Sequence, residues 1–121
     1  MSDCLFCKII NGELPSYKVY EDEHTYAFLD IRPQTKYHTL VIPKKHYVNV
    51  LDIPSEILAH VTATTKKVVD LYAKKLGVTN VNLVHNAGDK AQQMVFHFHM
   101  HIIPRGDWDD SFDDLLARLQ S

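Results

Sequence analysis

One short run near the C-terminus constrains the fold of this chain more than any other stretch, and it reads His97-Phe98-His99-Met100-His101-Ile102-Ile103. In a β-strand successive side chains point to opposite faces, so its three imidazoles share one face at spacings of about 7 Å. The apolar residues between them then face the core. On a helix the same positions would splay around the axis, and aromatic and β-branched neighbours favour a strand. We therefore predict a strand over residues 95–103.

Three imidazoles on one face do not by themselves name a chemistry. Neutral imidazole is the commonest side-chain metal ligand, and it also titrates near neutral pH, so it serves as a nucleophile or a base. A passive row of histidines on an exposed sheet face is the alternative. Because polar groups in a folded sheet usually have a reason to be there, the alternation favours metal binding or catalysis.

Composition limits the classes of protein to consider. The chain has 121 residues, 45% of them hydrophobic, which suits one modest core and a single domain over residues 1–121. Its formal charge of -2 leaves no basic field for non-specific nucleic-acid binding, so we expect no nucleic-acid partner. The first residues lack a basic, apolar leader, and no apolar run is long enough to cross a bilayer. We expect no membrane association and a cytoplasmic location.

The other elements follow from local patterns of apolar and turn residues. Residues 4–11 and the segment from Ser111 read as short helices, and residues 55–76 carry apolar positions at helical spacing up to Gly77. Residues 17–21, 26–30, 37–43 and 80–86 are rich in strand formers. Because strands and helices do not alternate regularly, we predict an α+β fold, a five-stranded antiparallel sheet with one long and two short helices.

Four blocks of sequence in order, residues 4–10, 28–33, 38–46 and 85–88, accompany the triad run. Together they resemble the histidine triad (HIT) family, in which His-x-His-x-His is followed by two apolar residues. The similarity extends along nearly the whole chain and is greatest to the Hint-like, bacterial-type branch with a zinc site. That branch contains nucleoside-monophosphate hydrolases and transferases, and the resemblance implies a HIT-like fold.

A metal site is the first candidate constellation. Cys4 and Cys7 have the two-residue gap that lets both thiolates reach one ion. The resemblance implies that His46 and His97 complete a tetrahedral Zn²⁺ site, and because such a closed site activates no water its role would be structural. From the Cys-x-x-Cys pair alone, a redox pair or two inert thiols remain open.

A nucleophile is the second candidate. An imidazole can attack phosphorus only while it is neutral and while its other nitrogen is held as a donor. The resemblance implies that His99 is the catalytic nucleophile and becomes nucleotidylated. His38 and His101 would form the supporting hydrogen-bonded shell and help to transfer protons.

A nucleotide pocket is the third candidate. The resemblance implies that Asp30 holds the ribose and that an apolar wall holds a purine. From the residues alone, the favoured interpretation of Asp30 is the cap of a turn before Pro33. The resemblance also implies that Asn86 and Gln93 hydrogen-bond near the phosphate, assisted by the backbone N–H of Val95, and that His99 and His101 contact the substrate. The remaining residues of the expected pocket are Leu5, Phe6, Ile9, Phe28 and Ile31.

Two residues depart from the family pattern. Met94 stands where a hydroxyl residue is usual, and Gln92 replaces a glycine that eases backbone approach. Both put substrate preference and rate in question. Three other histidines, His24, His60 and His85, join no matching constellation, so we assign them surface or packing roles. Trp108 is expected either at an interface or beside the active site.

Three functions follow from these constellations. The first is a hydrolase or transferase that cleaves purine nucleoside 5′-monophosphate esters or phosphoramidates at the α-phosphate through a nucleotidyl-histidine intermediate. A non-catalytic purine nucleotide-binding module is the alternative that the two departures favour, and a zinc hydrolase with a catalytic metal is a third. We also expect a homodimer, from the resemblance and from apolar residues of the strand 80–86 and the long helix, namely Val81, Leu83, Val69, Tyr72 and Leu76.

Overall fold

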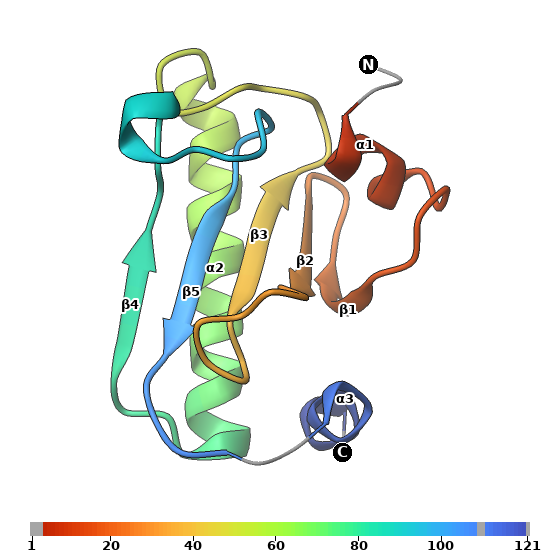
Figure 1. Ribbon diagram of the computed structural model, residues 1–121, viewed down its shortest axis with the longest axis vertical. Coiled ribbons are helices and arrows are strands. Elements are labelled where there is room, and N and C mark those ends of the chain that lie inside the picture. Colours follow the sequence, from red (N-terminus) through yellow and green to blue (C-terminus); the bar gives the residue numbers. More distant parts are fainter. Residues whose placement is uncertain (1–3, 109–110, 121) are drawn as a thin grey trace.

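The computed structural model describes residues 4–108 and 111–120, and its centre is a five-stranded antiparallel sheet (Figure 1). The strands lie in the order β1-β2-β3-β5-β4. They are β1 (Tyr17–Glu21), β2 (Thr25–Leu29), β3 (Thr39–Pro43), β4 (Val81–Val84) and β5 (Met100–Pro104). The helices are α1 (Leu5–Ile10), α2 (Ser55–Leu76), the 3₁₀ turn η1 (Asp89–Ala91) and α3 (Phe112–Gln120). The predicted α+β fold is confirmed.

Side-chain alternation in the central strands builds a separate apolar layer on each face of the sheet. The layer on the α2 side includes Ala27, Leu29, Val41, Phe98 and Ile102, packed with Val61, Val68 and Tyr72 of the helix. The layer on the α1 side comprises Phe6, Tyr26, Phe28, Leu40 and Ile42. Because both faces are covered, β2 and β3 are buried along their whole length. The triad therefore occupies a sheet that is packed on two sides.

The long helix has the bounds that its apolar spacing predicts. It ends where Gly77 adopts a left-handed φ of 69°, a conformation that glycine enters without a Cβ clash. Tyr72, which we expected at a subunit interface, is instead fully buried within the chain, where its hydroxyl bonds Thr39. No helix in residues 4–108 or 111–120 is long and apolar enough to cross a membrane.

The strand predicted over residues 95–103 is shorter than expected. β5 begins only at Met100, and residues 95–99 form a bent segment outside the ladder. Other groups hold this segment: the Phe98 N–H donates to the Tyr47 carbonyl at 2.6 Å, and the His97 ring bonds the Pro43 carbonyl. The predicted alternation of faces nevertheless holds, because Phe98, Met100 and Ile102 all pack in the layer on the α2 side.

The turn between β1 and β2 is organised by one carboxylate. Asp22 accepts hydrogen bonds from the backbone N–H groups of His24 and Thr25 at 2.9 and 2.8 Å, and from the Thr25 hydroxyl at 3.0 Å. Burial raises the pKa of Asp22, but these bonds to the charged form outweigh it and lower the pKa from its ordinary 3.8 to about 2. The ionised carboxylate therefore stabilises the folded chain.

We predict that Asp22→Asn lowers the free energy of unfolding by about 1–2 kcal/mol at pH 7, because the amide replaces an ionised acceptor. Since the folded pKa is depressed, the carboxylate's contribution is present above pH 3.8 and is lost as pH falls toward 2. Chemical denaturation at pH 7 and pH 3 measures both effects. The control is Asp70→Asn, which removes an exposed partner of Lys66 and changes stability by at most about 0.5 kcal/mol. Equal losses in the two variants at pH 7 would contradict the role of Asp22.

A second local feature is strain at Gln92. This residue ends η1 with a φ of 68°, and it is the one non-glycine residue with positive φ in the described parts of the chain. A side chain at such a φ costs energy that glycine does not incur. Gln92, which stands where the family pattern has glycine, therefore holds a backbone conformation that should lower the stability of the fold.

We predict that Gln92→Gly raises the free energy of unfolding by about 0.5–1 kcal/mol. Its matched control is Ala91→Gly, one residue earlier, where φ is not positive and glycine should destabilise by a similar amount. Urea denaturation of the two variants gives the comparison. If both substitutions shift stability in the same direction, strain at Gln92 is not the cause.

Candidate active site and metal centre

The three histidines of the triad lie on the α1 side of the sheet. Phe6 of α1 contacts two of the rings edge-on, with ring centroids 5.9 Å from His97 and 5.2 Å from His99. The ring of His101 lies 4.8 Å beyond His99. His97 and His99 are buried, at 0% and 5% exposure, and His101 is half-buried.

A backbone carbonyl fixes the tautomer of His99. Its Nδ1 lies 2.8 Å from the carbonyl oxygen of His97, and because a carbonyl only accepts, Nδ1 carries the proton. The lone pair of the neutral ring is therefore on Nε2. An imidazole in this state has the protonation that nucleophilic attack requires.

A backbone N–H fixes the next two rings in the same way. The N–H of Gln34 donates to His38 Nδ1 at 3.0 Å, so the proton of neutral His38 is on Nε2. That nitrogen lies 2.9 Å from His101 Nδ1 and donates to it. His101 then carries its own proton on Nε2. The result is a directed chain of donors that runs from the Gln34 N–H through His38 to His101.

Burial keeps these rings neutral. It is the largest influence on all three, and it lowers the pKa of His38 and of His99 below the ordinary 6.5. The pKa of His101 falls to about 4, through burial and then through the neighbouring His99 and His38. At neutral pH the tautomers set by the hydrogen bonds are therefore the populated forms.

Asp30 has two contacts at the edge of this group. Its Oδ1 accepts the Arg32 N–H at 2.9 Å, which is the turn-capping role open from the sequence, and its Oδ2 lies 3.7 Å from His38 Nε2. Asp30, His38 and His101 have ligand atoms close enough for a metal ion. His38 Nε2 carries a proton and donates a hydrogen bond to His101, so it has no lone pair for a metal ion. The hydrogen bonding therefore favours a chain of hydrogen bonds over metal binding at this group.

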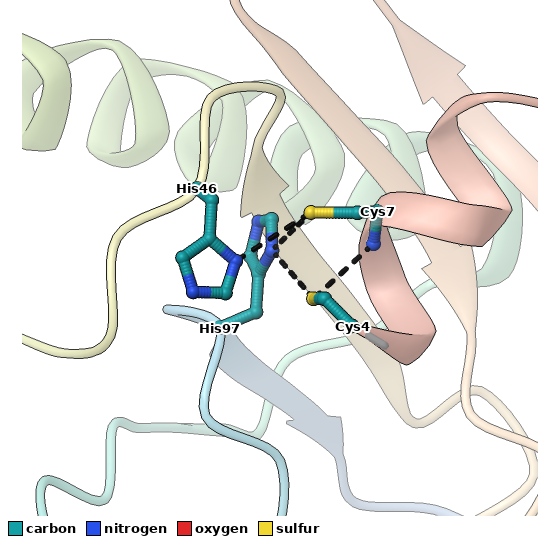
Figure 2. A group of neighbouring side chains, drawn as sticks. All are labelled: Cys4, Cys7, His46 and His97. Carbon is teal, nitrogen blue, oxygen red and sulfur yellow. Dashed lines mark hydrogen bonds between the residues drawn. The ribbon is translucent and has the colours of Figure 1, made fainter. Parts of the chain in front are cut away.

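The four expected metal ligands converge from three segments (Figure 2). His97 Nδ1 lies 3.3 Å from Cys4 Sγ and 3.5 Å from Cys7 Sγ, and His46 Nδ1 lies 3.5 Å from Cys7 Sγ. A tetrahedral zinc with S at about 2.3 Å and N at about 2.0 Å separates N and S ligands by roughly 3.5 Å. The spacing of these four side chains fits such an ion.

The protonation of His97 also suits a metal. Its Nε2 donates to the Pro43 carbonyl at 2.8 Å, so the lone pair on Nδ1 faces the two sulfurs. Burial raises the pKa of the Cys7 thiol to about 11, and hydrogen bonding and charge from Cys4 add to the shift. A half-buried thiol with a raised pKa gives a ligating thiolate only beside a cation, because the cation favours the deprotonated form.

The expected purine wall divides into buried and exposed parts. Phe6 and Phe28 are buried at 4% and 5% exposure, and Ile9 and Val95 pack against them. The other two members lie at the surface: Leu5 is 47% and Ile31 69% exposed. A cavity of about 570 Å³ lies alongside, lined by Cys4, Leu5, His46, Val48, Met94, Val95 and Phe96.

Gln93 has a different role from the phosphate contact we expected. Its Nε2 donates to the carbonyls of Val48 and Val95 at 2.6 and 3.0 Å. Its Oε1 accepts from the Gly88 N–H at 2.8 Å and from Asn49 Nδ2 at 3.2 Å. All four hydrogen-bonding positions of the amide are therefore used within the protein. Gln93 ties three loop segments together and leaves no group free for a ligand.

Two neighbours of Gln93 are available to a ligand. The Asn86 amide makes no hydrogen bond to another residue in the described part of the chain and is half-buried. Met94 is 84% exposed at the mouth of the loop, where it lines the cavity. The departure at Met94 therefore alters the exposed lining of this cavity.

The sequence did not identify the role of His85. We assigned it a surface or packing role, but its ring joins the backbone of His99 to a distant loop: Nδ1 lies 3.1 Å from the His99 carbonyl and Nε2 3.0 Å from the Val50 N–H. No pattern within a single sequence reveals contacts between segments 14 and 35 residues apart. Of the other unassigned groups, His24 and His60 stack on each other at 3.9 Å, and Trp108 packs on Tyr37 within the chain.

The chain is similar to known proteins along most of its length. The HIT domain model matches residues 11–107. An uncharacterised HIT-like protein of Methanocaldococcus jannaschii is 53% identical over 106 residues, which cover 88% of this chain and 81% of the relative. An adenosine 5′-monophosphoramidase of Saccharomyces cerevisiae is 42% identical over 86% of this chain and 63% of its own length.

Solved structures show the same likeness. A zinc-bound histidine triad family protein from Mycobacterium smegmatis superposes with a TM-score of 0.89 at 36% identity, over 98% of this chain and 94% of that chain. The sheet topology, the alternating histidines and these matches lead to one conclusion: the chain belongs to the HIT domain family.

Proposed function

We propose that this protein is a hydrolase or transferase that cleaves purine nucleoside 5′-monophosphate esters or phosphoramidates at the α-phosphorus. The observation that carries the proposal is the tautomer of His99, whose Nδ1 proton is bound by the His97 carbonyl so that the Nε2 lone pair is free. The similarity to a yeast adenosine 5′-monophosphoramidase supports a nucleotide substrate.

The reaction proceeds in two displacements. The Nε2 lone pair of His99 forms a bond to phosphorus while the bond to the leaving group breaks, and the leaving group departs with the bonding pair and a proton. Water then attacks phosphorus, the bonding pair returns to Nε2, and one proton of the water is released. During the first step the His99 ring becomes positively charged, and the His97 carbonyl stabilises that charge.

His38 and His101 serve as the supporting pair. The donor chain leaves the His101 Nε2–H as a terminal donor on the face shared with His99. This N–H donates to the phosphate or to the departing atom. The proton that the leaving group takes comes from solvent, because a neutral imidazole that gave up its only ring proton would become an imidazolate. In the second step the attacking water releases one proton to solvent.

Substrate contacts are assigned to the residues around this pair. Oδ2 of Asp30 accepts from the ribose hydroxyls, because Oδ1 is already occupied by the Arg32 N–H. Phe6, Phe28, Ile9 and Val95 back the purine, with Leu5 and Ile31 at the rim. The unoccupied amide of Asn86 and the Val95 N–H bind the phosphate.

Zinc, held by Cys4, Cys7, His46 and His97, is proposed as a structural ion that attaches α1 to the sheet. Support comes from ligand spacing near that of a tetrahedral site and from the zinc-bound relative of Mycobacterium smegmatis. A catalytic metal is less well supported, because His99 is not a member of the metal cluster.

We also propose a homodimer. β4 is an edge strand in the sheet order, and on it Leu83 is 52% exposed. Val50 and Leu51, in the loop bonded to His85 next to β4, are 46% and 86% exposed. An edge strand beside exposed apolar residues is a surface that a second copy can cover.

The second candidate function is a non-catalytic module that binds purine nucleotides. The exposed Met94 favours it, because thioether replaces a hydroxyl at the place where the leaving group would sit. Such a module binds AMP in calorimetry but releases no product faster than a variant without the nucleophile.

We predict that His99→Ala lowers turnover of adenosine 5′-phosphoramidate by at least about 10³-fold, because the covalent step is lost. AMP binding measured by calorimetry should change little, since the ribose and purine contacts remain. The control is His24→Ala, which removes an imidazole stacked on His60 of α2. Turnover that persists in His99→Ala would overturn the covalent mechanism, and equal, minimal turnover in the wild type would favour the binding module.

We predict that the purified protein contains about one zinc ion per chain and that Cys4→Ser lowers both metal content and melting temperature. A thiolate that is lost cannot be replaced by a hydroxyl at the same distance. Some turnover should remain, because the His99 tautomer does not depend on Cys4. Elemental analysis and thermal denaturation provide the readouts, with His60→Ala as the control. Protein that was never exposed to chelator and is fully folded with well under one metal per chain would contradict the proposal.

A further inference from the structure

His85 contacts the nucleophile's residue at the point where the sheet ends. The pairing of β4 with β5 stops at Val84 opposite His101. Continued by two residues, the same register would bring Asn86 opposite His99, but no strand pairing exists there. The carbonyl of His99 instead receives the Nδ1–H of His85 at 3.1 Å. The side chain of His85 thus takes the place of a backbone hydrogen bond between the extended β4 and β5 strands.

Both nitrogens of His85 are occupied, which fixes its tautomer. The Val50 N–H donates to Nε2 at 3.0 Å, so the proton of the neutral ring must be on Nδ1, where it reaches the His99 carbonyl. The ring also stacks on Phe98, with centroids 4.2 Å apart and an angle of 25° between the planes. One side chain therefore links the loop at Val50, the end of β4 and the bent segment before β5.

This link acts on the backbone of the nucleophile. Residues 95–99 lie outside the ladder, where the Phe98 N–H bonds the Tyr47 carbonyl and the His99 carbonyl bonds only the side chain of His85 among the described residues. The His99 ring lies on the α1 side beside Phe6, whereas the Phe98 ring on which His85 stacks belongs to the layer on the α2 side. His85 therefore reaches the His99 carbonyl from behind the imidazole and does not face the substrate.

We propose that His85 is a positioning residue for His99: its Nδ1–H holds the His99 carbonyl where the strand ladder is absent and so aims Nε2 at phosphorus. The proposal rests on the proposed function, in which His99 is the nucleophile. Displacement of a reacting group by about 1 Å can cost about 10²-fold in rate, so one backbone hydrogen bond at this peptide is enough to matter.

Three substitutions separate the two hydrogen bonds. His85→Asn places an amide N–H near the position of Nδ1 but provides nothing at Nε2, so it keeps the bond to His99 and loses that to Val50. His85→Gln places an amide oxygen near the position of Nε2 and keeps the bond to Val50 alone. His85→Leu removes both. Each protein is assayed at a temperature well below its own melting temperature, so that unfolding does not lower the rate.

The kinetic readout is the rate of His99 nucleotidylation by adenosine 5′-phosphoramidate in a single turnover. We expect His85→Leu and His85→Gln to lower this rate and kcat by about tenfold or more, with little change in KM, because ground-state contacts to the nucleotide remain. His85→Asn should recover to within about threefold of the wild type. A wild-type rate in His85→Leu, or equally slow reaction in His85→Asn and His85→Leu, would overturn the proposal.

Two readouts do not depend on activity. The carbonyl ¹³C shift of His99 should move in His85→Leu and His85→Gln but not in His85→Asn, and exchange of the Val50 amide should accelerate in His85→Leu and His85→Asn. A His99 carbonyl shift that is unchanged in His85→Leu would refute the hydrogen bond itself. If the wild type is not nucleotidylated, the proposed function fails, while these spectra still decide whether His85 holds the backbone.

Discussion

The hydrogen bond from His99 Nδ1 to the carbonyl of His97 is the interaction on which the rest of the site depends. A free imidazole exchanges its proton between two nitrogens, and only one of the two tautomers presents a lone pair on Nε2. A carbonyl that can only accept removes this freedom, and burial lowers the pKa of the ring so that the neutral form persists. The backbone carbonyl of His97 therefore sets the tautomer of His99, two residues later in the chain.

The same residue connects this interaction to the metal cluster. The carbonyl of His97 holds the His99 ring, while its own ring bonds the Pro43 carbonyl and turns Nδ1 toward Cys4 and Cys7. Phe6 lies between the two cysteines in sequence and packs edge-on against both rings. His97, a member of the candidate metal-ligand group, and His99 are thus held by one short segment, and movement of α1 would alter the contacts of both rings.

Loops around the triad are held by side chains rather than by strand pairing. Gln93 uses all of its amide groups to join the segments at Val48, Gly88 and Val95, and His85 joins Val50 to His99. The polar atoms of both side chains have hydrogen-bond partners. A polar group that is hydrogen-bonded in this way can be buried without destabilising the fold. Because the ladder between β4 and β5 ends before the triad begins, these side chains supply the order that a longer sheet would have given.

The sequence by itself determined the type and order of the main helices and strands and the opposite faces of the triad segment. Alternation of His97, His99 and His101 with apolar residues assigns opposite faces whatever the strand's length, and the long helix follows from apolar spacing and Gly77. The pairing of Cys4 and Cys7 with His46 and His97 came from the family resemblance, and the structure brings these side chains together.

Only the tertiary structure decided where β5 begins, which nitrogen of each ring carries the proton, and what Gln93 and His85 do. These properties depend on a carbonyl or an N–H that arrives from another segment: Pro43 for His97, Gln34 for His38, and Val50 for His85. A local pattern in the sequence records what a residue can donate or accept, but the fold alone brings its partner within hydrogen-bonding distance.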